Sequence, residues 1–222
     1  RSDRDARALI RRARRANPGV RVIVTGCYAQ VDAAALQSLG VNEIVGNEAK
    51  GRILDLIDKP TENATEGAAT AGPLAPQELR RLRGRSRAFF KVQEGCEAFC
   101  AYCIVPYARG RSRSLPLDAV RSGLESLKEG GNGEVVLTGV HLGLWGRDLD
   151  PPLPFSALLD AAEGAGIPRV RLSSLEPREA TTDVLNRLAG SPVLCPHLHI
   201  PLQSGSDRIL HAMGRPYSSS EF

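Results

Sequence analysis

The sequence lacks any hydrophobic run long enough to cross a membrane. No stretch of about 18 apolar residues occurs in its 222 residues. The opening RSDRDARALIRRARR also lacks the apolar core of a signal peptide. We therefore expect no membrane insertion. The chain has no initiating Met and opens inside a predicted helix, so we expect it to be a fragment of a longer protein.

Cysteine is scarce and unevenly placed. The chain has five Cys, too few and too clustered for the disulfide framework of a small secreted protein. Three of them, Cys96, Cys100 and Cys103, lie in the stretch GCEAFCAYC with the spacing C-x3-C-x2-C. In an intracellular chain such clustering favours metal binding, so we expect a cytoplasmic protein with a metal site here.

Positive charge is modest overall but concentrated locally. The net charge is +4, and arginines cluster at residues 1–21, 79–93 and 109–113. A guanidinium group fits phosphate well. For residues 1–15 a solvated helix face is the simpler interpretation. Arg109, Arg111 and Arg113 lie beside the cysteines, and we expect these three to contact phosphates.

The first part of the chain alternates strand and helix signals. β-branched or apolar runs at 20–26 and 43–46 predict strands, and helices are expected near 31–39 and 48–57. This βαβα pattern is typical of a parallel sheet covered by helices. The stretch 59–85 is rich in Pro, Gly, Ala and Thr and shows no strand period, which predicts a linker. The expected domains are thus 1–58 and 86–222.

The second part repeats the alternation four times. Strands are predicted at 88–95, 134–140, 169–175 and 197–202, and helices at 116–129, 154–165, 181–189 and 206–213. Successive βα units with polar residues at the strand ends suggest a (β/α) barrel, whose sites lie at the C-terminal ends of its strands. The chain stops after the fourth unit, so we expect a truncated, partial barrel within an α/β fold.

The three clustered cysteines leave two kinds of metal site open. Three thiolates can hold three irons of a cubane cluster, whereas structural clusters usually take four Cys. The remaining iron would then be free for a small ligand, which is typical of a catalytic metal. Zinc is the alternative, although zinc sites favour two separated C-x2-C pairs and no second pair occurs.

The spacing C-x3-C-x2-C after a first barrel strand resembles the signature of radical S-adenosylmethionine (SAM) enzymes. The resemblance implies that Cys96, Cys100 and Cys103 hold a 4Fe–4S cluster and that S-adenosylmethionine binds its open iron. It also implies that one electron from an external donor, passed through the cluster, yields a 5′-deoxyadenosyl radical. Tyr102, the aromatic residue before the last Cys, would lie near the adenine.

Longer stretches resemble the methylthiotransferases, and the tRNA branch more closely than the ribosomal-protein branch. GCEAFCAYCIVPYARGRSRS carries most of this resemblance, and VIVTGCYAQ at 22–30 looks like the end of a cysteine motif in the family's N-terminal domain. The resemblance implies that Cys27 is one of three ligands of a second 4Fe–4S cluster, which carries the sulfur to be transferred. The other two ligands are not in this chain.

Further matches fall at the predicted strand ends. VVLTGVHLG, RLSSLEP and HLHIPLQSGSDRIL resemble the second to fourth barrel strands of the same family. Each of these stretches turns polar at its C-terminal end, where barrel enzymes place their sites, so we expect cofactor contacts from four residues: Gly139, Ser174, Glu176 and Gln203. For Ser174 and Gln203, hydrogen bonding within loops is an equally open interpretation. Cys195 and the histidines are interpreted as packing residues, with metal binding by His197 and His199 as the alternative.

The stretches PYARGRSRS and TGVHLG resemble the enzymes that methylthiolate N6-threonylcarbamoyladenosine at position 37 of tRNA. The resemblance implies that Arg109, Arg111 and Arg113 contact phosphates of the anticodon stem. It also implies a C-terminal RNA-binding domain, which this chain does not contain. Two alternatives remain in the same family, an isopentenyladenosine tRNA or a ribosomal protein as substrate. A third is a zinc-stabilised RNA-binding module without catalysis.

Overall fold

The computed structural model describes residues 2–58, 65–66, 74 and 86–222, and it divides into two compact units. The first comprises Arg1–Gly72 and Ile104–Gly110, and the second comprises Pro73–Cys103 and Arg111–Phe222. Most of the predicted linker 59–85 lies outside the described residues, so the predicted domain limits stay a prediction.

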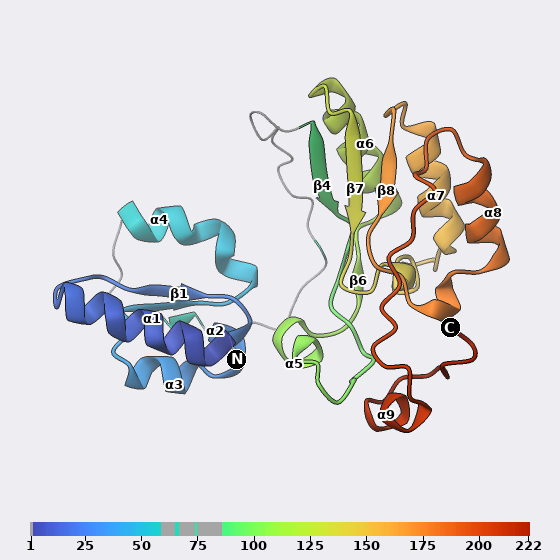
Figure 1. The fold of residues 1–222 in the computed structure, drawn as a ribbon. Coiled ribbons are helices and arrows are strands. Elements are labelled where there is room, and N and C mark those ends of the chain that lie inside the picture. The colour runs from blue at the N-terminus through green and yellow to red at the C-terminus, as the bar shows by residue number, and fades with distance from the viewer. Residues whose placement is uncertain (1, 59–64, 67–73, 75–85) are drawn as a thin grey trace. The chain divides into compact units, whose positions relative to one another are not determined.

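The first unit is built around a parallel three-stranded sheet in the order β1-β2-β3 (Figure 1). Its strands are β1 (Ile23–Thr25), β2 (Glu43–Val45) and β3 (Thr65–Glu66). Its helices are α1 (Ser2–Ala16), α2 (Cys27–Val31), α3 (Ala33–Ser38), the 3-10 turn η1 (Glu48–Arg52), α4 (Ile53–Asp58) and α5 (Val105–Arg109). Side chains of α1, α2, α3, β2 and the connection before β2 form a buried apolar cluster: Ile10, Ala29, Leu36, Val41 and Ile44.

The helix expected near 31–39 is present as α3, but two features of the first unit were not predicted. A separate helix, α2, precedes α3, and Asp32 lies between the two. The Asp32 carboxylate accepts a hydrogen bond from the amide of Ala35 (3.1 Å), and such an N-cap starts a new helix. Residues 65–66, predicted as linker, form β3. A two-residue strand is too short to show an alternating pattern in the sequence.

The second unit contains a parallel sheet in the order β4-β7-β8, with α6, α7 and α8 alongside it (Figure 1). Its strands are β4 (Arg87–Lys91), β7 (Glu134–Thr138) and β8 (Val170–Leu172), and a separate antiparallel pair joins β5 (Gln93–Glu94) to β6 (Arg113–Ser114). Its helices are α6 (Leu117–Glu129), η2 (Leu142–Leu144), α7 (Phe155–Gly164), η3 (Pro177–Glu179), α8 (Thr182–Gly190) and α9 (Asp207–Ala212). The expected α/β class with parallel sheets is confirmed.

An apolar core fixes this sheet against its helices. Val120, Leu124 and Leu127 repeat at helical spacing on α6 and are almost fully buried together with Val135 and Leu137 of β7. Burying a side chain of this size contributes about 1.5–3 kcal/mol, so this face of α6 stabilises the packing of the helix on the sheet. Trp145 is also fully buried, and its indole N–H donates to the carbonyl of Leu115 (2.9 Å).

Three strand predictions for the second unit were too long, and a fourth was wrong. The strands expected over 134–140 and 169–175 are shorter, Glu134–Thr138 and Val170–Leu172. The strand expected over 88–95 ends at Lys91, and β5 then turns away to pair with β6. In the segment expected as a strand over 197–202, which the structure describes in full, there is one isolated parallel bridge, Ser174 with His199. Another bridge, Val170 with Leu194, lies just before the segment. Pro196 precedes that segment and Pro201 lies within it, and proline cannot donate to a strand ladder.

Within the part of the chain that the structure describes, no helix has the length and apolar character that crossing a bilayer requires.

Candidate active site

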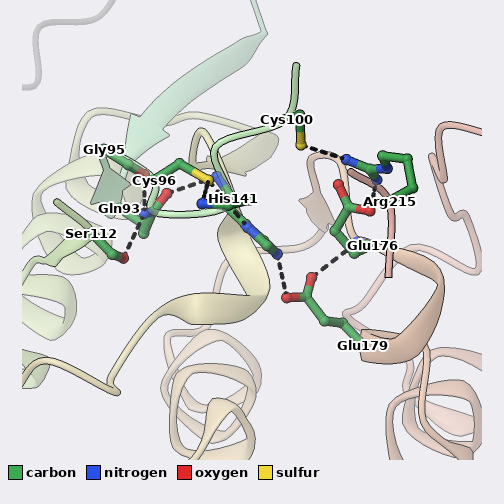
Figure 2. Close-up of polar contacts among 10 residues, drawn as sticks. Gln93, Gly95, Cys96, Cys100, Ser112, His141, Glu176, Glu179 and Arg215 are labelled. Carbon is green, nitrogen blue, oxygen red and sulfur yellow. Dashed lines mark hydrogen bonds and ion pairs between the residues drawn. The ribbon is translucent and has the colours of Figure 1, made fainter. Parts of the chain in front are cut away.

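The loops that carry the predicted site residues meet at one edge of the second unit's sheet. Since β4, β7 and β8 run parallel, their C-terminal ends share that edge. The cysteine loop follows β4 and β5, residues 139–141 follow β7, and residues 173–176 follow β8. Figure 2 shows Cys96 beside His141, and Cys100 and Glu176 both in contact with Arg215.

Gln93 ties the cysteine loop to the end of β7. Its side chain is completely buried. The amide nitrogen donates to the carbonyl of Gly95 (2.8 Å) and to the hydroxyl of Ser112 (2.9 Å), and the amide oxygen accepts from the backbone N–H of His141 (2.9 Å). One buried amide thus satisfies groups on three segments, which fixes the start of the cysteine loop.

Cys96 is contacted by the imidazole of His141, and the carboxylate of Glu179 lies against the opposite side of that ring. The Cys96 sulfur lies 3.5 Å from Nδ1 of His141 and accepts from the amide of Ala98 at 3.4 Å. On the other side of the ring, Nε2 lies at ion-pair distance, 2.6 Å, from Oε1 of Glu179. The other oxygen of Glu179 accepts from the amide of Glu176 (2.9 Å). This chain of contacts favours an imidazolium beside a thiolate.

The pKa values of this pair shift accordingly. Burial lowers the pKa of His141, but its hydrogen bonds to Cys96 and Glu179 outweigh burial and raise that pKa to about 9. Burial raises the pKa of Cys96, yet the hydrogen bonds from His141 and Ala98 lower it below its ordinary value. A thiolate is the form of cysteine that binds metal, so Cys96 is prepared to be a ligand.

Cys100 has a cationic neighbour of its own. Nη1 of Arg215 lies 3.3 Å from the Cys100 sulfur and 3.4 Å from the phenol oxygen of Tyr102. Nη2 of the same guanidinium pairs with the carboxylate of Glu176 (Figure 2). Two of the three loop cysteines are therefore each approached by a cation, and both cations are held by carboxylates of the turn at 176–179.

Cys103 completes the set of three thiols on one loop. It is partly exposed, and its amide donates to the carbonyl of Cys100 (2.9 Å). Among the described residues, no three His, Cys, Asp or Glu side chains gather around the position of a single ion. In a cubane cluster each Cys binds a different iron, so the thiols need not converge on one point. Three soft donors, one with a lowered pKa, fit a 4Fe–4S cluster.

Of the five residues predicted to contact the cofactor, four lie in the loops at the same edge: Tyr102, Gly139, Ser174 and Glu176. Tyr102 is half exposed. Gly139 packs against Gln93 so closely that a Cβ there would lie 2.8 Å from Oε1. The hydroxyl of Ser174 lies 2.6 Å from Nδ1 of His199. Gln203 is exposed and has φ 63°, a left-handed backbone that is uncommon for a residue other than glycine.

The remaining predicted site residues are divided between the two units. Cys27, at the first position of α2, and Arg109, in α5, belong to the first unit. Arg111 and Arg113 belong to the second, where Arg111 pairs with Glu97 at 3.7 Å and is largely exposed. Cys195 is buried, as expected, and its sulfur contacts Nε of Arg169 at 2.9 Å.

A cavity of about 520 Å³ opens next to the cysteine loop. His141 and Asp148 line it together with Glu97, Ala98, Ser112, Leu144 and Arg147. Its volume is in the range of small-molecule sites. The cavity therefore provides space for a bound molecule beside the Cys96–His141 pair.

Comparison with known proteins identifies the family. The profile of the radical SAM superfamily matches residues 90–222, which is more than half of the chain and includes the whole cysteine loop. The chain belongs to the radical SAM superfamily. Membership implies that the chain binds a 4Fe–4S cluster and S-adenosylmethionine.

The resemblance to methylthiotransferases is also confirmed. This radical SAM chain is 37% identical over 228 residues to the threonylcarbamoyladenosine tRNA methylthiotransferase MtaB of Bacillus subtilis, which covers 99% of the chain and 50% of that protein. It is 36% identical to MtaB of Aquifex aeolicus, over 99% of the chain and 55% of that protein. The tRNA-2-methylthio-N(6)-dimethylallyladenosine synthase of Syntrophobacter fumaroxidans is 33% identical, over 96% of the chain and 48% of that protein. The chain spans about half the length of the curated relatives it matches.

The fold also has a solved counterpart. The radical S-adenosylmethionine methyltransferase TsrM from Kitasatospora setae, solved with tryptophan and a SAM analogue, superimposes with a TM-score of 0.61. The match covers 97% of this radical SAM chain and 48% of that one at 16% sequence identity. At this identity the likeness concerns the fold alone.

Four residues of the site were not predicted as site residues from the sequence: Gln93, His141, Glu179 and Arg215. Weak signals exist for the first three, since Gln93 precedes the Gly-Cys pair, His141 follows a strand end, and Glu179 lies near Glu176. No local pattern marks Arg215, which is 115 residues from its partner Cys100.

Proposed function

We propose that this chain is the catalytic part of a tRNA methylthiotransferase that modifies C2 of N6-threonylcarbamoyladenosine at position 37. The observation that carries the proposal is the C-x3-C-x2-C loop of a radical SAM domain at the C-terminal edge of a parallel sheet. The names of the relatives MtaB from Bacillus subtilis and Aquifex aeolicus support the substrate.

In this proposal Cys96, Cys100 and Cys103 hold the 4Fe–4S cluster. When bound, the cluster supplies the electron for reductive cleavage of S-adenosylmethionine. Gln93 orients the cysteine loop by its buried hydrogen bonds. His141, held by Glu179, keeps a proton on its imidazole beside the Cys96 sulfur and so stabilises the thiolate form that binds iron.

The cofactor is assigned to residues of the second unit. We assign Tyr102, Gly139, Ser174, Glu176 and Gln203 to cofactor binding. Arg109, Arg111 and Arg113 are assigned to tRNA phosphates, which guanidinium groups bind well. Cys27 is assigned to a second 4Fe–4S cluster in the full-length protein, and an external donor supplies the electrons. tRNA modification of this kind takes place in the cytoplasm.

Metal analysis tests the site first. We expect anaerobically reconstituted protein to contain iron and sulfide, and to release 5′-deoxyadenosine when S-adenosylmethionine and a reductant are added. Cys100→Ala should abolish this cleavage, because a cluster with two Cys ligands cannot be held in place. A colourless protein with one zinc and no iron would instead favour the zinc-stabilised RNA-binding module.

A product assay then tests the substrate. The full-length enzyme is incubated with tRNA carrying threonylcarbamoyladenosine, with tRNA carrying isopentenyladenosine, and with ribosomal protein. Methylthio product on the first tRNA alone supports the proposal. Product on the second tRNA or on the ribosomal protein would move the enzyme to another branch of the family.

A further inference from the structure

Arg215 is placed beside the cysteine loop by a helix C-terminus. Gly214 follows α9 with φ 70°, the left-handed conformation that commonly ends helices, and its amide donates to the carbonyl of His211 (3.0 Å). The carbonyl of Met213 accepts from the amide of Ala101 (3.0 Å). A backbone hydrogen bond therefore joins this turn directly to the cysteine loop. Arg215 follows Gly214 in the same turn.

The Arg215 side chain is buried and has specific partners. Only 4% of it is exposed. One terminal nitrogen pairs with the Glu176 carboxylate, while the other lies 3.3 Å from the Cys100 sulfur. The guanidinium carbon also lies 5.1 Å from the centre of the Tyr217 ring, within cation–π distance. A buried guanidinium without such partners would be costly, so this arrangement specifies one orientation of the planar fork.

A donor in this position acts on a metal-bound sulfur. When an iron–sulfur cluster is reduced, negative charge increases on its irons and its sulfur ligands. A hydrogen bond from a cation to a ligand sulfur stabilises that charge and raises the reduction potential of the cluster. Arginine suits this role because it stays protonated throughout the working pH range.

We propose that Arg215, oriented by Glu176, is a positioning residue that donates to the Cys100 sulfur and thereby raises the reduction potential of the cluster. The inference rests on the assignment of Cys100 as a cluster ligand in the proposed function. It gives Glu176 a defined task, which is to direct one nitrogen of the guanidinium to the carboxylate and the other to the sulfur.

The test compares matched variants of the reconstituted chain by redox titration, monitored by electron paramagnetic resonance in the absence of S-adenosylmethionine. Arg215→Met removes the positive charge and the two nitrogens that contact Cys100 and Glu176. Arg215→Lys keeps the positive charge but places it on a single ammonium group. Arg187→Met is the control, since Arg187 is also ion-paired, to Asp160 and Glu163, but has no contact in the site. Iron content is measured for every protein.

We expect Arg215→Met to bind iron and to have a more negative midpoint potential. At a fixed potential its ratio of reduced to oxidised cluster should fall about tenfold, which corresponds to about 59 mV for one electron. Arg215→Lys and Glu176→Gln should shift in the same direction by less, and Arg187→Met should match the wild type.

Three results would count against these assignments in different ways. Arg215→Met with full iron and a wild-type potential overturns the role of Arg215, even if S-adenosylmethionine binding is weakened. If Arg215→Met binds no iron, the other two variants decide. A wild-type potential in both Arg215→Lys and Glu176→Gln would then overturn the role of Arg215. A wild-type chain that binds no iron refutes the ligand assignment of the proposed function instead.

Discussion

At the scale of single residues, the absence of a side chain at Gly143 makes room for a carboxylate. A Cβ at this position would lie 2.2 Å from the carboxyl carbon of Glu179. The carboxylate cannot simply move aside, because one oxygen contacts His141 and the other accepts from the amide of Glu176. Gly143 is therefore part of the support for the Cys96–His141 pair, although it contacts neither residue in that pair.

We expect Gly143→Ala to lower the free energy of unfolding by about 2 kcal/mol, because a buried donor loses its partner when Glu179 is displaced. Urea unfolding of the purified chain measures this. Gly164→Ala is the matched control, since a Cβ added at Gly164, in α7, would have no atom within 4 Å, and we expect this variant to be neutral or slightly stabilising. Equal stability of the two variants would contradict the assigned role of Gly143.

At the scale of elements, a single carboxylate links the three strands of the β4-β7-β8 sheet at the edge opposite the site. Glu134 begins β7, and its side chain contacts Arg87 of β4 (3.0 Å), Arg171 of β8 (3.0 Å) and Arg169 (3.6 Å). Burial raises the pKa of Glu134, but the hydrogen bond from Arg171 and the charge of Arg87 outweigh burial and lower the pKa below its usual value. The N-terminal edge of the sheet is thus stabilised by charge, whereas the C-terminal edge carries the chemistry.

Glu134→Gln should reduce stability near neutral pH by roughly 1–2 kcal/mol, and this difference should disappear in acid. A carboxylate whose pKa is lowered by folding stabilises the native state above its unfolded pKa of about 4.3. That contribution is lost as the pH falls through the lower folded pKa. Urea unfolding from pH 7 to pH 3 measures it, with Glu125→Gln on the exposed side of α6 as the control. A difference that stays constant over this range would contradict the prediction.

At the scale of the whole molecule, the two compact units carry different parts of the proposed chemistry. The second unit contains all three loop cysteines and the residues around them, whereas the first contains Cys27. With one cysteine of the proposed second set, the first unit lacks enough thiolates for a cluster of its own. The chain should therefore assemble one cluster rather than two.

We expect the reconstituted chain to bind about four irons, as one cubane cluster requires. Cys27→Ala should not change this number, whereas Cys96→Ala should lower it strongly. In a longer form of the protein that supplies two more cysteines, Cys27→Ala should remove about four irons from a larger total. Iron and sulfide analysis measures each case. Loss of iron from the 222-residue chain on Cys27→Ala would contradict the assignment of Cys27 to a separate cluster.

The sequence by itself determined the α/β class, most of the helices and the cysteine loop. These features depend on local patterns, namely alternating apolar runs, helical spacing and the spacing of three cysteines. The strand predicted at 197–202 was wrong. Pro196 before the segment and Pro201 within it cannot donate to a strand ladder, which the apolar pattern does not reveal. β3 was missed because two residues carry no periodicity.

Only the tertiary structure decided what surrounds the cysteines. Arg215 and Cys100 are 115 residues apart, and they meet because the turn after α9 lies against the cysteine loop. His141 and Glu179 meet because β7 and β8 are parallel neighbours, so the loops that follow them share one edge. The physical reason is that spacing along the chain specifies local structure and candidate ligands, whereas the partners of a buried charge are set by which strand ends the packed core brings together.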